Sequence, residues 1–168
     1  MLHRKHSRTG GIKMRKRQKG LILICARTDE ELSSLAWSAL NLELELALDI
    51  IIISKRDRFT EQDLNQVEAK NNVNIYHFFL DDLDTKGTSR LIFEAFRLSP
   101  RIIYFDNFDY GTMINPVISV AESSHLIILG LKNQSPSEAI EQLTAKICKP
   151  HRFKDALNKV IAPSYEDV

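Results

Sequence analysis

The residues whose types could do chemistry lie where two apolar stretches end. The first stretch, LILICA at 21–26, is followed by RTDEELSS, where a phosphate-binding loop would carry glycines, a lysine and a hydroxyl. Ser33 supplies the hydroxyl, but Asp29, Glu30 and Glu31 place three carboxylates in the first turn of the next helix. They complement the positive end of the helix dipole and would repel a triphosphate. The segment therefore predicts an acid-capped helix with Asp29 as its N-cap.

The second stretch, IIYFD, ends at Asp106 and has the form of a Walker B strand. In that motif the acid holds magnesium, and a following glutamate orients the attacking water. The next residue is Asn107, whose amide can hydrogen-bond a water but cannot accept its proton. Any bound nucleotide should therefore be hydrolysed slowly, if at all.

The elements that must position these residues alternate along the chain. Strands are expected at 21–26, 49–54, 72–80, 101–109 and 125–131. Helices are expected at 30–46, at 60–70 with a Thr60 cap, at 88–98, at 113–122, from Pro136 with a Ser135 cap, and at 151–160. This alternation predicts an α/β fold: a parallel or mostly parallel sheet with helices on both faces. Ligands of such a fold bind at the carboxyl ends of the strands.

Composition limits the class of protein. The 168 residues suit one soluble domain, and two cysteines without a metal-binding spacing suggest a reduced, cytoplasmic chain. No apolar run is long enough for a membrane span, and the start does not resemble a signal peptide. We expect a basic arm over 1–19, a core over 20–163 and a tail over 164–168.

The arm carries eight basic residues and no acid, which leaves 15 basic and 22 acidic residues in the remainder. The basic residues are Arg4, Lys5, Arg8, Lys13, Arg15, Lys16, Arg17 and Lys19. Such a cluster can bind nucleic-acid phosphates. The arm has no aromatic side chain for base stacking, so a solvated leader is the favoured interpretation.

The order of these elements resembles the C-terminal ATPase domain of type IV pilus and type II secretion ATPases, a RecA-like P-loop core. The resemblance covers about residues 19–163, and its most specific part is AESSHLIILGLKNQSPSEAIEQL, which is similar to the His-box segment and the helix after it. It implies a ring-forming ATPase fold.

When the catalytic positions of the family are placed on this sequence, the resemblance implies that most of the residues needed for ATP hydrolysis are absent. The loop glycines fall on Ala26, Asp29 and Glu31, and the lysine falls on Leu32. The catalytic glutamate after the second strand falls at Ser54 and Lys55, and the segment YHFFLDD at 76–82 lacks the arginines of the family. What remains is a vestigial nucleotide site at most, formed by Thr28, Ser33, Ser34, Asp106, Asn107, His125 and Lys132.

The sequence thus favours a catalytically inactive relative that acts as a binding, scaffold or regulatory subunit, without a cofactor or metal. Its partner would be a pilus or secretion protein, such as an active ATPase, or a second copy. His125 is then a structural histidine, and Phe78, Phe79, Phe105 and Phe108 pack in the core or at an interface.

Three alternatives stay open. One is a nucleotide-binding protein or weak ATPase that takes ATP and magnesium in a non-standard site, where Lys132 reaches the phosphates. Another is nucleic-acid binding through the arm. The last is a remnant no longer under selection for any activity.

Overall fold

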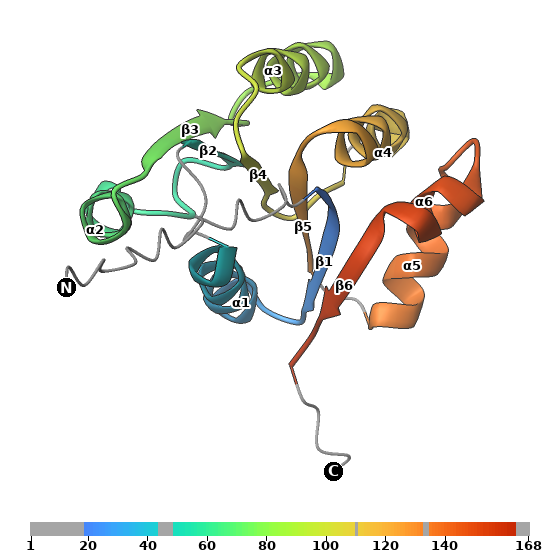
Figure 1. The fold of residues 1–168 in the computed structure, drawn as a ribbon, viewed down its shortest axis with the longest axis horizontal. Coiled ribbons are helices and arrows are strands. Elements are labelled where there is room, and N and C mark those ends of the chain that lie inside the picture. Colours follow the sequence, from blue (N-terminus) through green and yellow to red (C-terminus); the bar gives the residue numbers. More distant parts are fainter. Residues whose placement is uncertain (1–18, 44–48, 110, 133–134, 164–168) are drawn as a thin grey trace, which may run out of the picture.

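Six parallel strands form one sheet in the computed structural model, which describes residues 19–43, 49–109, 111–132 and 135–163 (Figure 1). The strands are β1 (Gly20–Ala26), β2 (Asp49–Ser54), β3 (Asn74–Phe79), β4 (Ile102–Phe105), β5 (Leu126–Lys132) and β6 (Leu157–Ile161). Their order across the sheet is β3-β2-β4-β5-β1-β6, and every neighbouring pair is parallel. The expected α/β fold is confirmed.

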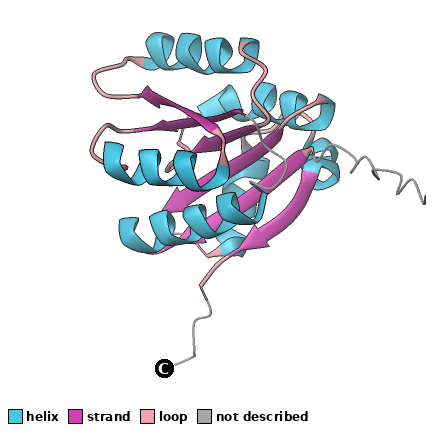
Figure 2. Ribbon diagram, turned by 60° about the vertical axis from the view of Figure 1, so that its left-hand side comes forward, coloured by secondary structure: helices cyan, strands magenta, loops and turns pink. Residues whose placement is uncertain are grey.

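Helices cover both faces of the sheet (Figures 1 and 2). Alternate residues of β1 point to opposite faces, so Ile22 and Ile24 belong to the core on the side covered by α1 (Asp29–Glu43) and α2 (Glu61–Asn71). Leu21 and Leu23 belong to the opposite core, which includes residues of α3 (Thr85–Arg97), α4 (Ile114–Ser123), α5 (Pro136–Ala145) and α6 (Pro150–Ala156). A short 3₁₀ turn, η2 (Gly111–Met113), precedes α4. Burial on both faces is why the inner strands are almost continuously apolar.

The last helix expected from sequence is confirmed only in its first part. A helix was expected over 151–160, but α6 ends at Ala156 and the chain continues as β6, which pairs with β1. Phe153 and Ala156 are buried and anchor α6 to the core, and the Asn158 side chain donates to the Lys19 carbonyl at 2.7 Å. Strand pairing with β1 therefore overrides the helical pattern of this segment.

Local capping decides where the other helices begin. Thr60 caps α2 by accepting from the Asp63 N–H, and Ser135 caps α5, both as expected. The Glu138 side chain completes a capping box with Ser135. Helix α3 begins three residues earlier than expected, because the Asp84 carboxylate accepts from the Gly87 N–H at 2.7 Å.

The N-terminal arm up to residue 18 and the tail 164–168 lie outside the described residues, as do residues 44–46 of the helix expected at 30–46. Contacts of the arm with nucleic acid therefore stay a prediction. In the described part of the chain, no helix is both long and apolar enough to cross a membrane.

Candidate functional site

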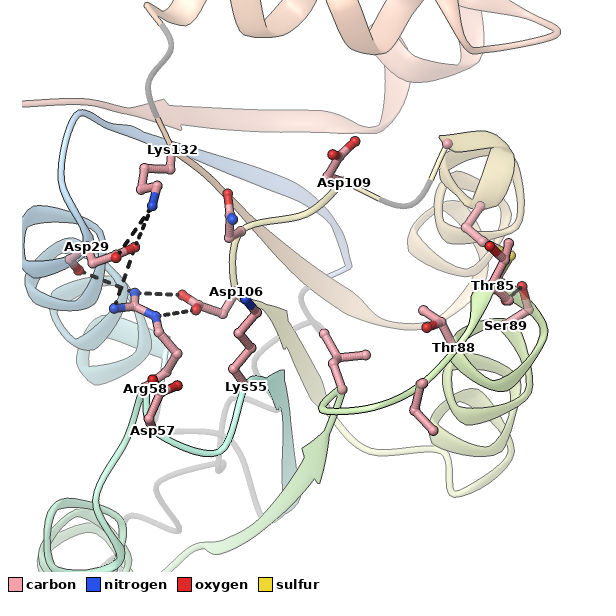
Figure 3. Close-up of a pocket in the computed structure, with 15 residues that line it drawn as sticks. Asp29, Lys55, Asp57, Arg58, Thr85, Thr88, Ser89, Asp106, Asp109 and Lys132 are labelled. Carbon is pink, nitrogen blue, oxygen red and sulfur yellow. Dashed lines mark hydrogen bonds and ion pairs between the residues drawn. The ribbon is translucent and has the colours of Figure 1, made fainter.

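A cleft of about 740 Å³ lies at the carboxyl ends of the strands (Figure 3). Its polar lining comes from the loops after β2 and β4, from the first turns of α1 and α3 and from the end of β5, and its apolar lining comes from the segment after β3 and from η2. The lining residues are Asp29, Lys55, Asp57, Arg58, Leu80, Leu83, Thr85, Thr88, Ser89, Asp106, Asn107, Asp109, Gly111, Met113 and Lys132. A cleft of this size and place is where an α/β fold binds a ligand.

The connection from β1 to α1 is too short to wrap a phosphate. Only Arg27 and Thr28 separate the strand from the helix. Asp29 was expected to be the N-cap of α1, but the N-cap is Thr28, because the Thr28 hydroxyl accepts a hydrogen bond from the Glu31 N–H at 3.2 Å. The Thr28 carbonyl accepts from the Leu32 N–H at 3.0 Å, and the Glu31 carboxylate accepts from the Arg27 N–H at 2.9 Å. Three N–H groups of this segment are thus bound to its own chain, whereas a phosphate loop offers such groups to the anion.

The position of the family's loop lysine is part of the core. Leu32 is fully buried on the inner side of α1, where it belongs to the cluster that also contains Ile24 and Ile128. The hydroxyl residues that matched the family, Thr28, Ser33 and Ser34, do not line the cleft. The first turn of α1 therefore offers a phosphate neither a lysine nor a hydroxyl in the cleft.

The Asp106 carboxylate is buried and bound by a guanidinium. Arg58 donates from Nε to Oδ2 at 2.6 Å and from Nη2 to Oδ1 at 3.1 Å, and the Tyr104 hydroxyl donates to Oδ1 at 2.7 Å. The hydrogen bond to Asp106 raises the pKa of the Arg58 side chain above its ordinary value, so the guanidinium stays charged. Both oxygens that could hold magnesium are engaged, and the residues present do not fit a magnesium-nucleotide site of the usual kind.

A second carboxylate joins this pair to Lys132. Asp29 lies 3.7 Å from Nη1 of Arg58 and 3.4 Å from Nζ of Lys132, so the four side chains alternate in charge across the cleft (Figure 3). We call Asp106, Arg58, Asp29 and Lys132 the ion-pair network. Asp29 supplies from within the chain the negative charge that a phosphate would bring.

The structure divides the residues that the sequence singled out. Asp106, Asn107 and Lys132 line the cleft. His125 does not, because it precedes β5 while Lys132 ends that strand, about 23 Å away at the rise of a parallel strand. The His125 ring shares a hydrogen bond with the Ser124 hydroxyl at 2.6 Å. The backbone carbonyl of His125 accepts a hydrogen bond from the Gly20 N–H.

The four phenylalanines that were expected in the core or at an interface differ in burial. Phe105 and Phe108 are buried and meet edge to face, with ring centroids 5.5 Å apart. Phe78 and Phe79 lie on β3 and are partly exposed.

Sequence reasoning missed Arg58 and the hydroxyls of Thr85, Thr88 and Ser89. The available signal was position: KRDR at 55–58 follows β2 at the same edge of the sheet as Asp106. Lys55, in that run, lines the cleft and has no ion pair with any other residue in the described part of the chain. Within that part, no three His, Cys, Asp or Glu side chains cluster closely enough to hold a metal ion.

Comparison with known proteins shows a similarity of fold to solved structures and no match to a protein family or a curated protein. No protein-family model matches the sequence, and no curated protein matches it. Solved structures do match: the ATPase DotB of Legionella pneumophila is 14% identical with a TM-score of 0.62, over 86% of this chain and 40% of that one. The pilus retraction motor PilT with bound ADP is 16% identical with a TM-score of 0.64, over 87% of this chain and 42% of that one.

The ATPase DotB of Yersinia pseudotuberculosis is 13% identical with a TM-score of 0.62, over 86% of this chain and 38% of that one. The chain therefore spans about two fifths of the length of these ATPases. At such identities the likeness concerns architecture, and it agrees with the parallel sheet and its two helical layers. The chain has the fold of the PilT and DotB ATPases, as the sequence resemblance implied.

Proposed function

We propose that this chain is a pseudo-ATPase: it keeps the fold of pilus and secretion ATPases, does not hydrolyse ATP, and acts by binding a protein partner. The partner class is a component of a pilus or secretion machine, such as an active ATPase of the same fold. The chain would serve there as a scaffold or regulatory subunit.

The bidentate contact between Arg58 and Asp106 carries this proposal. A cation is already held by the carboxylate that would bind magnesium, at 2.6 and 3.1 Å, and that carboxylate is almost fully buried. Magnesium would have to displace a charged, bidentate hydrogen-bonded partner from a site with little access to water. The short β1–α1 connection and the buried Leu32 support the same conclusion independently.

The test is calorimetric titration of the full chain with ATP and with ADP, each with magnesium, together with a turnover assay. We expect no heat, no shift in melting temperature at millimolar nucleotide and no phosphate release. A ligand present at 100 times its Kd would stabilise the fold by about 2.7 kcal/mol, so an unchanged melting temperature at about 1 mM nucleotide excludes a Kd of about 10 μM or tighter.

Asn107→Gly is the matched control variant, because Asn107 has a φ of 48° that glycine adopts without strain and its side chain lines the cleft. Phosphate release that this variant abolishes would refute the proposal. Equal rates of phosphate release by the wild type and the Asn107→Gly variant would point to a contaminating ATPase.

The second candidate function is nucleotide binding in a non-standard site. The size of the cleft and the uncompensated Lys55 favour it, whereas Lys132, the lysine expected to reach the phosphates, is engaged by Asp29. Saturable micromolar binding that Lys55→Met weakens at least about tenfold, an effect typical of a lost charged contact, would select this function over the first.

A further inference from the structure

The outer edge of β3 is open to strand pairing. β3 is the last strand on its side of the sheet, and among the described residues β2 is its only strand partner. Its sequence, NIYHFF, contains no charge and no proline, and Tyr76 is 48% exposed. The opposite edge strand, β6, carries Lys159, a residue type that discourages edge pairing.

Two hydrogen bonds fix which backbone groups face outward. The Leu80 N–H donates inward to the Ser54 carbonyl of β2 at 3.0 Å, so the even-numbered residues of this segment face β2. The Ile75 N–H donates outward to the Glu68 carboxylate of α2 at 2.6 Å. Since successive residues alternate, the backbone groups of His77 and Phe79 also point outward, and no described residue pairs with them.

Carboxylates lie at both ends of this open segment. Glu68 covers the start, at Ile75, and Asp81 follows the end, where it accepts from the Arg56 N–H at 2.8 Å. The Arg56 guanidinium lies over the Phe79 ring at 4.3 Å from its centroid, so one cation is also near the end. The free edge is thus an uncharged, aromatic strand with an acid at each end.

We propose that this edge binds an extended segment of a partner protein that carries a basic residue at each end of a short uncharged stretch. The added strand would pair with the outward groups of His77 and Phe79, and its cations would approach Glu68 and Asp81. Backbone pairing supplies the affinity in this mode, and the charges set the choice of partner and the register.

Charge argues against a second copy in the register that pairs both outward residues, His77 and Phe79. In antiparallel pairing of two β3 strands, outward residues must face outward residues. If His77 faces Phe79 of the copy, the Glu68 contact survives, but Ile75 and its Glu68 then face Asp81 of the copy, twice by symmetry. Like charges placed opposite each other destabilise a strand pair. A basic segment meets the same two acids with favourable charge.

This surface would serve the binding role proposed above, but it does not depend on the absence of ATPase activity. The two proposals therefore fail separately: nucleotide turnover would refute the first, and the peptide experiment below decides the second.

The test uses capped synthetic peptides and the isotope-labelled full chain. The probe is KTVTVTK, with ETVTVTE as the charge control and KTVPVTK as the pairing control, since proline lacks the donor that a strand needs. We expect KTVTVTK to shift the amide signals of His77 and Phe79 and to bind about tenfold more tightly than ETVTVTE at low salt, a difference that shrinks at high salt. KTVPVTK should not bind.

Two variants of the chain complete the design. Phe79→Pro removes an outward donor and should abolish binding, because proline is tolerated where the N–H faces away from the sheet. The double variant Glu68→Gln with Asp81→Asn keeps the acceptor oxygens and should weaken binding about fivefold. The proposal is overturned by equal binding of the basic and acidic peptides, by no binding at millimolar peptide, or by a dimer of the chain that protects these amides.

Discussion

Removal of the Arg58 guanidinium should destabilise the fold more than any loss of a surface charge. The Asp106 side chain is 3% exposed and the Arg58 side chain 15%, so Arg58→Met leaves a buried carboxylate that keeps the Tyr104 hydroxyl and has no other ion-pair partner among the described residues. Breaking a buried ion pair on one side costs about 3–5 kcal/mol, and the partial exposure of Arg58 favours the lower end, about 3 kcal/mol. In a domain of this size that corresponds to a fall in melting temperature of about 6–12 °C.

The assay is urea unfolding of four proteins: wild type, Arg58→Met, Asp106→Asn and the double variant. Asp106→Asn still accepts a hydrogen bond from Tyr104, so the cycle isolates the charge pair. We expect a coupling free energy of about 2 kcal/mol. The matched control is Arg97→Met, because Arg97 and Glu94 form an exposed pair at 3.1 Å whose loss should change stability by less than about 0.5 kcal/mol.

A coupling below about 0.5 kcal/mol would refute the reasoning, since contacting charges in one network couple more strongly than that. It would mean that the cleft solvates Asp106 once Arg58 is gone. Magnesium could then displace Arg58 from Asp106 at little energetic cost.

Three further predictions concern single residues. Gly130→Ala should cost about 1–3 kcal/mol of unfolding free energy, because the new Cβ would lie 2.9 Å from the Tyr104 hydroxyl oxygen; an unchanged urea midpoint would contradict this. Burial lowers the pKa of His77 below 6.5, so the folded state favours the neutral ring. The neutral ring therefore contributes folding stability above pH 6.5, and this contribution is lost as the pH falls through the pKa of the folded state. His77→Gln should therefore lose less stability on acidification than wild type, measured by urea unfolding across that range, and parallel pH profiles would count against it. Burial also raises the pKa of the Cys25 thiol to about 11, so a thiol reagent should modify exposed Cys148 in the native chain and Cys25 only after unfolding; equally fast modification of both would contradict the buried position of Cys25.

The strands and most helices could be predicted because their signals are local. Continuous apolar runs indicated β1, β2, β4 and β5, and short capping patterns placed the starts of α2 and α5. The segment of β6 could not be predicted this way, since its state depends on the open edge of β1 more than 130 residues away, and the pattern of LNKVI suits either structure.

The candidate site was only half predictable. The carboxylates of α1 and the Asp106–Asn107 step are visible in the sequence, and so is the missing loop lysine. The identity of the cation that binds Asp106 was not visible, because Arg58 is 48 residues from it and no periodicity links the two.

The sequence by itself determined the composition of this protein's cleft: acids where a phosphate loop has glycines, an amide where a catalytic glutamate would stand, and apolar strands that bury the sheet on both faces. Tertiary structure alone decided how those groups are used. Parallel pairing of β2 with β4 aligns their carboxyl ends, and this alignment brings Arg58 onto Asp106. Likewise, the pairing of β5 with β1 brings Lys132 to Asp29 and leaves His125 at the far edge. Local propensity sets which element most segments form, with β6 as the exception, whereas contacts between distant segments depend on the order of strands across the sheet.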